Sequence, residues 1–72
     1  MKQTIFKSKQ QGHLAIQEDE NGISLWQDLY YEYDFLEIDT EQPKTFKEAK
    51  TFLETQYGKL KMIETITSKR IK

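Results

Sequence analysis

Residues 45–57 place the strongest constraint on the fold, because they combine a helix start, an apolar stripe at helical spacing and a helix stop. Thr45 and Glu48 fit a capping box, in which the Thr45 hydroxyl accepts from the backbone N–H of Glu48 and the Glu48 carboxylate reaches back. Pro43 cannot lie inside a helix, and Gly58 suits the left-handed position that ends one. The stripe consists of Phe46, Ala49, Phe52, Leu53 and Tyr57. We predict one helix of about three turns here.

The segment before this helix carries a hairpin signal. Residues 13–18 alternate, with Leu14 and Ile16 on one face, and residues 23–27 have the composition of a returning strand. Asn21-Gly22 lies between them, and both residue types tolerate the positive φ that a type I′ turn needs twice. We therefore predict a hairpin that turns at Asn21-Gly22 and pairs residues near 17–18 with those near 24–25.

Residues 28–38 admit two interpretations. As a strand, the segment places one set of side chains on a single face, and the alternation then slips, which indicates a bulge or a strand end near Phe35. The set comprises Leu29, Tyr31, Tyr33 and Phe35, of which we expect the three aromatic residues to meet the helix stripe. As a helix, the chain would be capped by Ser24 and would carry a stripe of Leu25, Leu29, Tyr33 and Leu36. The Tyr- and Phe-rich composition favours the strand.

Two further strands are predicted at the ends of the chain. Residues 3–9 form a short apolar and β-branched run, and residues 59–67 place Leu60, Met62 and Ile66 on one face. Residues 68–72 read as a basic, frayed tail. The expected fold is a single small α+β domain over residues 1–72, with two layers. A curved antiparallel sheet of four to five strands would carry the helix on one face.

The chain is short and lacks cysteine. With 72 residues it has room for one domain, which buries only about 60% of the surface of its unfolded form. The absence of cysteine excludes disulfides, thiolate zinc sites and cysteine catalysis, and is compatible with a cytoplasmic location. No apolar run approaches the roughly 20 residues of a membrane span, and no signal peptide is visible, so we expect no membrane partner.

Charge is distributed unevenly along the sequence, although the net charge is only −1. Residues 1–9 carry +3, residues 10–43 carry −9 with no Lys or Arg, and residues 44–72 carry +5. Such segregation is unusual and makes charged surfaces the natural candidates for function.

No catalytic constellation is evident, and we expect a protein that is not an enzyme and uses no cofactor or metal. His13 is the only histidine, and in a strand it reads as a surface or half-buried residue. The three glycines suit turns and a helix cap, and no phosphate-binding loop is formed. Carboxylates are plentiful, but acid–base catalysis needs a pocket that shifts their pKa values, and a domain this small rarely offers one.

The leading functional hypothesis is a small protein-interaction or regulatory module with a basic protein as its partner. The candidate contact surface is the outward face of the predicted strand, formed by Asp28, Tyr30, Glu32 and Asp34. Carboxylates there would steer the partner and Tyr30 would be a desolvated anchor. A homodimer is compatible with a chain this short, and the richness in Lys, Gln, Thr and Ile suggests an AT-rich bacterial or phage gene.

The alternative hypothesis is a nucleic-acid-binding protein that uses the basic residues of the last strand and the tail. These are Lys59, Lys61, Lys69, Arg70 and Lys72. Against it, the aromatic residues of this chain are interleaved with Asp and Glu, which repel phosphate. A third idea, an acidic mimic of nucleic acid, needs several acidic strands. Alternate strand residues lie about 6.7 Å apart, whereas duplex DNA carries one charge per roughly 1.7 Å.

Overall fold

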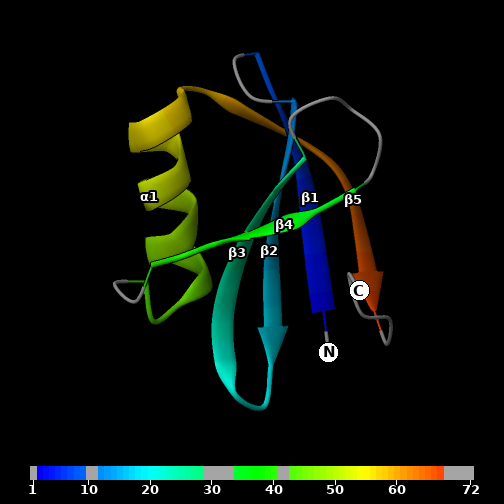
Figure 1. The fold of residues 1–72 in the computed structure, drawn as a ribbon, viewed down its shortest axis with the longest axis vertical. Coiled ribbons are helices and arrows are strands. Elements are labelled where there is room, and N and C mark those ends of the chain that lie inside the picture. The colour runs from blue at the N-terminus through cyan, green and yellow to red at the C-terminus, as the bar shows by residue number, and fades with distance from the viewer. Residues whose placement is uncertain (1, 10–11, 29–33, 41–42, 68–72) are drawn as a thin grey trace.

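The computed structural model describes residues 2–9, 12–28, 34–40 and 43–67. Its elements, in chain order, are β1 (Lys2–Ser8), β2 (Gly12–Asp19), β3 (Gly22–Asp28), β4 (Leu36–Ile38), α1 (Phe46–Tyr57) and β5 (Leu60–Thr67). The strands form one antiparallel sheet in the order β4-β3-β2-β1-β5, and α1 lies on one face of it (Figure 1). The predicted α+β fold with one helix on an antiparallel sheet is therefore confirmed.

The helix begins and ends at the predicted residues. The backbone N–H of Glu48 donates to Thr45 Oγ1 at 3.1 Å, as a capping box requires. The Glu48 carboxylate accepts from the backbone N–H of Lys44 at 2.8 Å, one residue before the cap. At the other end, the N–H of Gly58 donates to the Glu54 carbonyl, and Gly58 has a φ of 84°. This positive φ is easily adopted by glycine, so the helix stops there.

The hairpin of β2 and β3 is confirmed, but its turn begins one residue earlier than predicted. Gln17 pairs with Ser24 as expected. Asp19 pairs with Gly22, so the turn consists of the two residues between them and not of Asn21-Gly22. Asp19 Oδ1 accepts from the backbone N–H of Asn21 at 2.8 Å. This bond belongs to a turn of Glu20 and Asn21. Gly22, which has a φ of 120°, is therefore the first residue of β3.

Two apolar clusters lie on opposite faces of the sheet. On the helix face, which α1 covers mainly over β2 and β3, the buried cluster comprises Phe6, Leu14, Ile16, Leu25, Ala49 and Leu53. On the opposite or far face, Ile5 and Ala15 are buried together with Phe35. The prediction that Phe35 meets the helix stripe is therefore wrong. Phe35 precedes the short strand β4 and packs on the other layer, because the segment from Asp28 to Ile38 is not one continuous strand.

The structure decides part of the ambiguity in residues 28–38. Residues Gly22–Asp28 form β3, so the helical alternative capped by Ser24 is wrong. The next strand begins at Leu36, one residue after the predicted break near Phe35. Residues 29–33, including Tyr31 and Tyr33, lie outside the described part of the chain.

β5 contains an irregularity that moves Ile66 to the far face. Ile5 pairs with Glu64 and Phe6 pairs with Met62, so Ile63 is an extra residue, a β-bulge. A bulge shifts side chains beyond it to the opposite face relative to simple alternation. Ile66 accordingly packs against the far-face cluster, and its predicted placement on the face of Leu60 and Met62 is wrong.

Candidate binding site

Four lysines from the two ends of the chain gather at one end of the β1–β5 pair. Lys7 of β1 pairs directly with Lys61 of β5. Lys9 follows the end of β1 and Lys59 precedes the start of β5, so each lies one residue beyond the last pair of the ladder. The side chains surround an open hollow of about 510 Å³, lined by Lys7, Ser8, Lys9, Lys59, Leu60 and Lys61. We call this site the lysine hollow.

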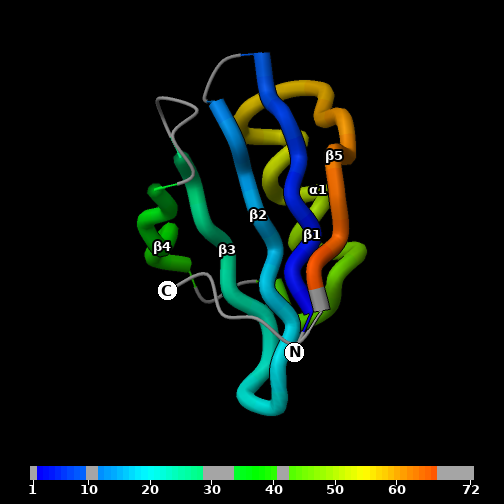
Figure 2. The backbone as a smooth tube through the Cα atoms, turned by 90° about the vertical axis from the view of Figure 1, so that its right-hand side faces the viewer, coloured from blue at the N-terminus to red at the C-terminus, as the bar shows by residue number. Residues whose placement is uncertain are grey.

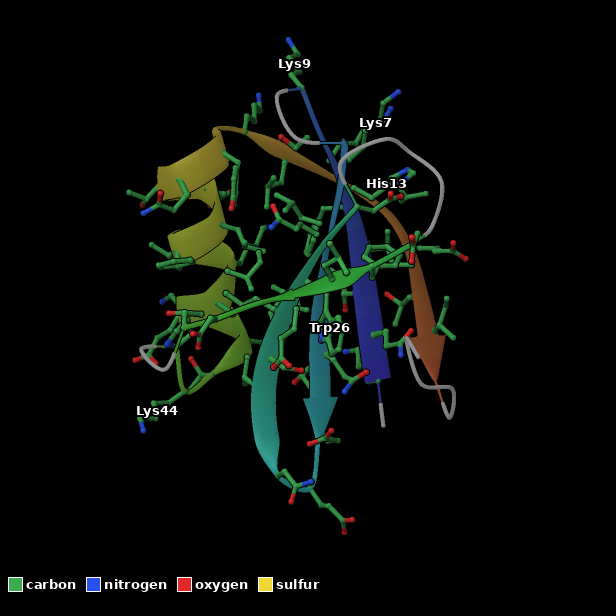
Figure 3. The ribbon with its side chains drawn as sticks, viewed as in Figure 1. Lys7, Lys9, His13, Trp26 and Lys44 are labelled. Carbon is green, nitrogen blue, oxygen red and sulfur yellow. The ribbon has the colours of Figure 1, made fainter. Side chains whose placement is uncertain are left out.

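Neighbouring elements hold the floor of the lysine hollow in place. Gly58 ends α1, so the chain turns directly into β5 with Leu60 packed against the helix-face core. The Ser8 hydroxyl is buried and donates to the Tyr57 carbonyl at 3.5 Å, which links β1 to the end of α1. Figure 3 shows Lys7 and Lys9 together at this end of the sheet, far from Lys44 at the start of α1. The backbone that carries the lysines is thus joined to the end of α1 and to the helix-face core.

The electrostatics of the lysine hollow favour an anionic ligand. Like charges directly opposite each other in a strand pair are destabilising, so the Lys7–Lys61 pairing does not strengthen the fold. The lining residues that the structure describes include four lysines and no carboxylate. Lysines on an edge strand also discourage aggregation, which accounts for Lys61 of β5 but not for Lys7 of the inner strand β1.

The predicted acidic face is not assembled as expected. Asp28 is only 2% exposed, and its Oδ2 lies 2.9 Å from Nδ1 of His13, so it does not belong to an outward surface. The reason is that Asp28 ends β3 directly opposite His13 of β2, and the two side chains satisfy each other inside the protein. Asp34 is exposed but lies outside any strand, and Tyr30 and Glu32 fall outside the described residues.

The basic residues of the alternative hypothesis are only partly placed. Lys59 and Lys61 are exposed and line the lysine hollow. The remaining members, Lys69, Arg70 and Lys72, fall outside the described residues. Sequence reasoning missed Lys7 and Lys9 as members of the same site. The available signal was the +3 charge of residues 1–9, which matters only once β1 is known to lie beside β5.

His13 and Asp28 form the one titratable pair that is buried among the described residues. Sequence reasoning expected a surface or half-buried His13, but its side chain is only 8% exposed, on the far face. The pairing helps to explain its burial, because each group is a hydrogen-bond partner of the other. In the described ranges no three His, Asp or Glu side chains are grouped as metal ligands would be.

Trp26 lies on the far face and does not take part in the lysine hollow. It packs against the cluster of Ile5 and Phe35, and its Nε1–H donates to Ser24 Oγ at 3.0 Å. Its edge lines a separate hollow that contains the carboxylates of Asp19 and Glu37. The described part of the chain therefore does not combine an aromatic platform with the lysines.

The described helix α1 has 12 residues, and it lacks the length and the apolar character that crossing a bilayer requires. No family model, no curated protein sequence and no solved structure matches this chain.

Proposed function

We propose that this protein is a non-catalytic interaction module that binds an acidic segment of a partner protein at the lysine hollow. The observation that supports the proposal is the gathering of four lysines, in β1 and β5 or next to them, around Leu60. Their charge would steer an acidic segment towards the site and raise its association rate. We assign this role to the cytoplasm, in a bacterial or phage setting, as the cysteine-free and Lys- and Gln-rich composition leads us to expect.

The chemistry of the hollow favours a protein ligand over a nucleic acid. Leu60 and the aliphatic stems of the lysines offer apolar surface to side chains of a peptide. Binding of single-stranded nucleic acid usually combines basic residues with aromatic stacking platforms. Trp26 lines a hollow that carries carboxylates instead of lysines. Nucleic acid remains the second candidate, because Lys7 and Lys9 lie beside Lys59 and Lys61 and enlarge the basic surface that could contact phosphates.

A pair of charge reversals with the same net charge tests the proposed site. In Lys59→Glu with Lys61→Glu, affinity for a fluorescent peptide of alternating Glu and Val should fall by roughly tenfold or more, because two of the four cations become repulsive. In Lys44→Glu with Lys47→Glu, the same change is made at the start of α1, and affinity should change by less than about threefold. Fluorescence anisotropy at low and physiological salt measures both variants, and wild-type binding should weaken as salt rises.

Three outcomes would overturn the proposal. Equal losses in the two double variants would mean that only net charge matters. The nucleic-acid candidate would be favoured if the protein binds single-stranded DNA or RNA more tightly than the peptide and if Lys59→Glu with Lys61→Glu abolishes that binding. If the protein binds a basic peptide and Glu32→Lys with Asp34→Lys abolishes that binding, the contact surface is the acidic segment and not the lysine hollow.

A further inference from the structure

The two edges of the sheet differ in what they offer to another strand. β4 forms one edge and has three residues, whereas β5 forms the other and has eight (Figure 2). β5 pairs with β1 on its inner side, and no strand among the described residues pairs with its outer side. A strand with one unpaired side presents a row of backbone donors and acceptors to an extended peptide. β5 is long enough for such pairing, and β4 is not.

The side chains of β5 present different chemistry on the two faces of the sheet. Lys61 lies on the far face with Lys7, and Met62 lies on the helix face with Phe6. Met62 is 61% exposed and the bulge residue Ile63 is 42% exposed, because α1 packs mainly against β2 and β3 and leaves this edge uncovered. Before the bulge, the edge therefore has a cationic side and an apolar side, and beyond the bulge Glu64 lies opposite Ile5 on the far face.

We propose that β5 binds an extended acidic segment of the partner as a sixth strand of the sheet. Successive residues of a strand point to opposite faces, so the segment would alternate acidic and apolar side chains. The acidic side chains would meet Lys59 and Lys61 on the far face, and the apolar ones would meet Leu60 and Met62 on the helix face. This inference rests on the proposed function and adds the conformation and the sequence pattern of the ligand.

The bulge at Ile63 divides the pairing edge of β5 into two parts. A bulge bends the strand and interrupts the regular ladder, which protects a sheet edge from indiscriminate association. The part after the bulge would pair with the rest of the ligand, and the part before it, Leu60–Met62, carries Lys61 and would meet the acidic side chains of the ligand. A second copy of β5 aligned antiparallel over this part would bring Lys61 near lysines of its partner, so like charges disfavour that occupant.

Backbone N-methylation of the peptide distinguishes strand addition from simple charge attraction. Methylating alternate residues blocks the hydrogen bonds along one edge of an extended peptide and leaves the other edge intact. Two isomers, methylated on the Glu residues or on the Val residues, have the same charge and composition. For an eight-residue Glu–Val peptide, the length of β5, we expect one isomer to bind like the parent and the other roughly tenfold more weakly. Parent and isomers binding equally would overturn strand addition while leaving acidic capture intact, and failure of the parent itself would overturn both.

A matched pair of substitutions tests the position of the bound strand. Met62→Ser and Leu36→Ser each remove an exposed apolar side chain from an edge strand, since Leu36 is 57% exposed on β4. Affinity for the parent peptide should fall about threefold or more in Met62→Ser and stay unchanged in Leu36→Ser. Amide hydrogen exchange should slow in β5 on binding and not in β4. Equal losses of affinity in the two variants, or slower exchange at β4 on binding, would overturn the assignment. So would a dimer in analytical ultracentrifugation that is lost on mutation of β5 and is not dissociated by the peptide.

Discussion

The carboxylate of Asp28 is held at the end of β3 by the imidazole of His13, and both side chains are buried. A buried carboxylate without a partner would carry a large desolvation cost, and this contact offsets part of that cost. The same contact removes Asp28 from the surface that a partner could reach. Because Asp28 is buried, the predicted acidic contact surface loses one of its carboxylates. We therefore propose the exposed lysines as the contact surface instead.

The Thr45 hydroxyl is the residue-scale feature that the stability of α1 depends on most directly. Thr45→Ala removes the acceptor of the Glu48 N–H and should lower the free energy of unfolding by about 1 kcal/mol, or several degrees in Tm for a domain of this size. Thr51→Ala, on an exposed turn of the same helix, is the control and should change Tm little, because alanine is a good helix former. Thermal denaturation followed by circular dichroism measures both. A similar Tm for wild type and Thr45→Ala would contradict the capping role.

At the scale of elements, β5 shows how one extra residue changes the role of a strand. Before the bulge, Leu60 and Met62 belong to the helix face, and after it Ile66 belongs to the far face. The strand therefore contributes to both apolar clusters, and it also leaves Met62 and Ile63 exposed at the sheet edge.

The bulge predicts unequal costs for two apolar truncations in β5. Ile66→Ala should lower the free energy of unfolding by about 1–2 kcal/mol, because Ile66 packs on the cluster of Ile5 and Phe35. Met62→Ala should change it by less than about 0.5 kcal/mol, since this side chain is mostly exposed. Urea denaturation gives both values. Comparable losses would mean that the two side chains share one face and that the bulge is absent.

At the scale of the whole molecule, β1 joins the two ends of the chain. It pairs with β2 on one side and with β5 on the other, so residues 2–8 lie beside residues 60–67. Two basic segments separated by the acidic part of the sequence thereby become neighbours at the lysine hollow. The resulting molecule has a small core, because 72 residues cannot bury much apolar surface.

The small core leaves little stability to spare. Leu53 of α1 is fully buried against β2 and β3, and Leu53→Ala should cost about 2–5 kcal/mol, a large part of the total expected for this length. Leu36→Ala, at an exposed site on β4, should cost less than about 0.5 kcal/mol. Chemical denaturation at 25 °C would show Leu53→Ala close to unfolding. A loss below about 1 kcal/mol would contradict the packing of α1 on this face.

The sequence by itself determined the local features: the bounds of α1, the hairpin of β2 and β3 and the order of elements along the chain. These depend on caps, turns and periodicity within a few residues, and they are readable without knowledge of the rest of the fold. Only the tertiary structure decided that β1 lies beside β5, that Phe35 and Ile66 pack on the far face, and that Lys7 and Lys9 join Lys59 and Lys61. Pairing between distant segments depends on packing across the whole core, and a one-residue shift in register moves each following side chain to the other face.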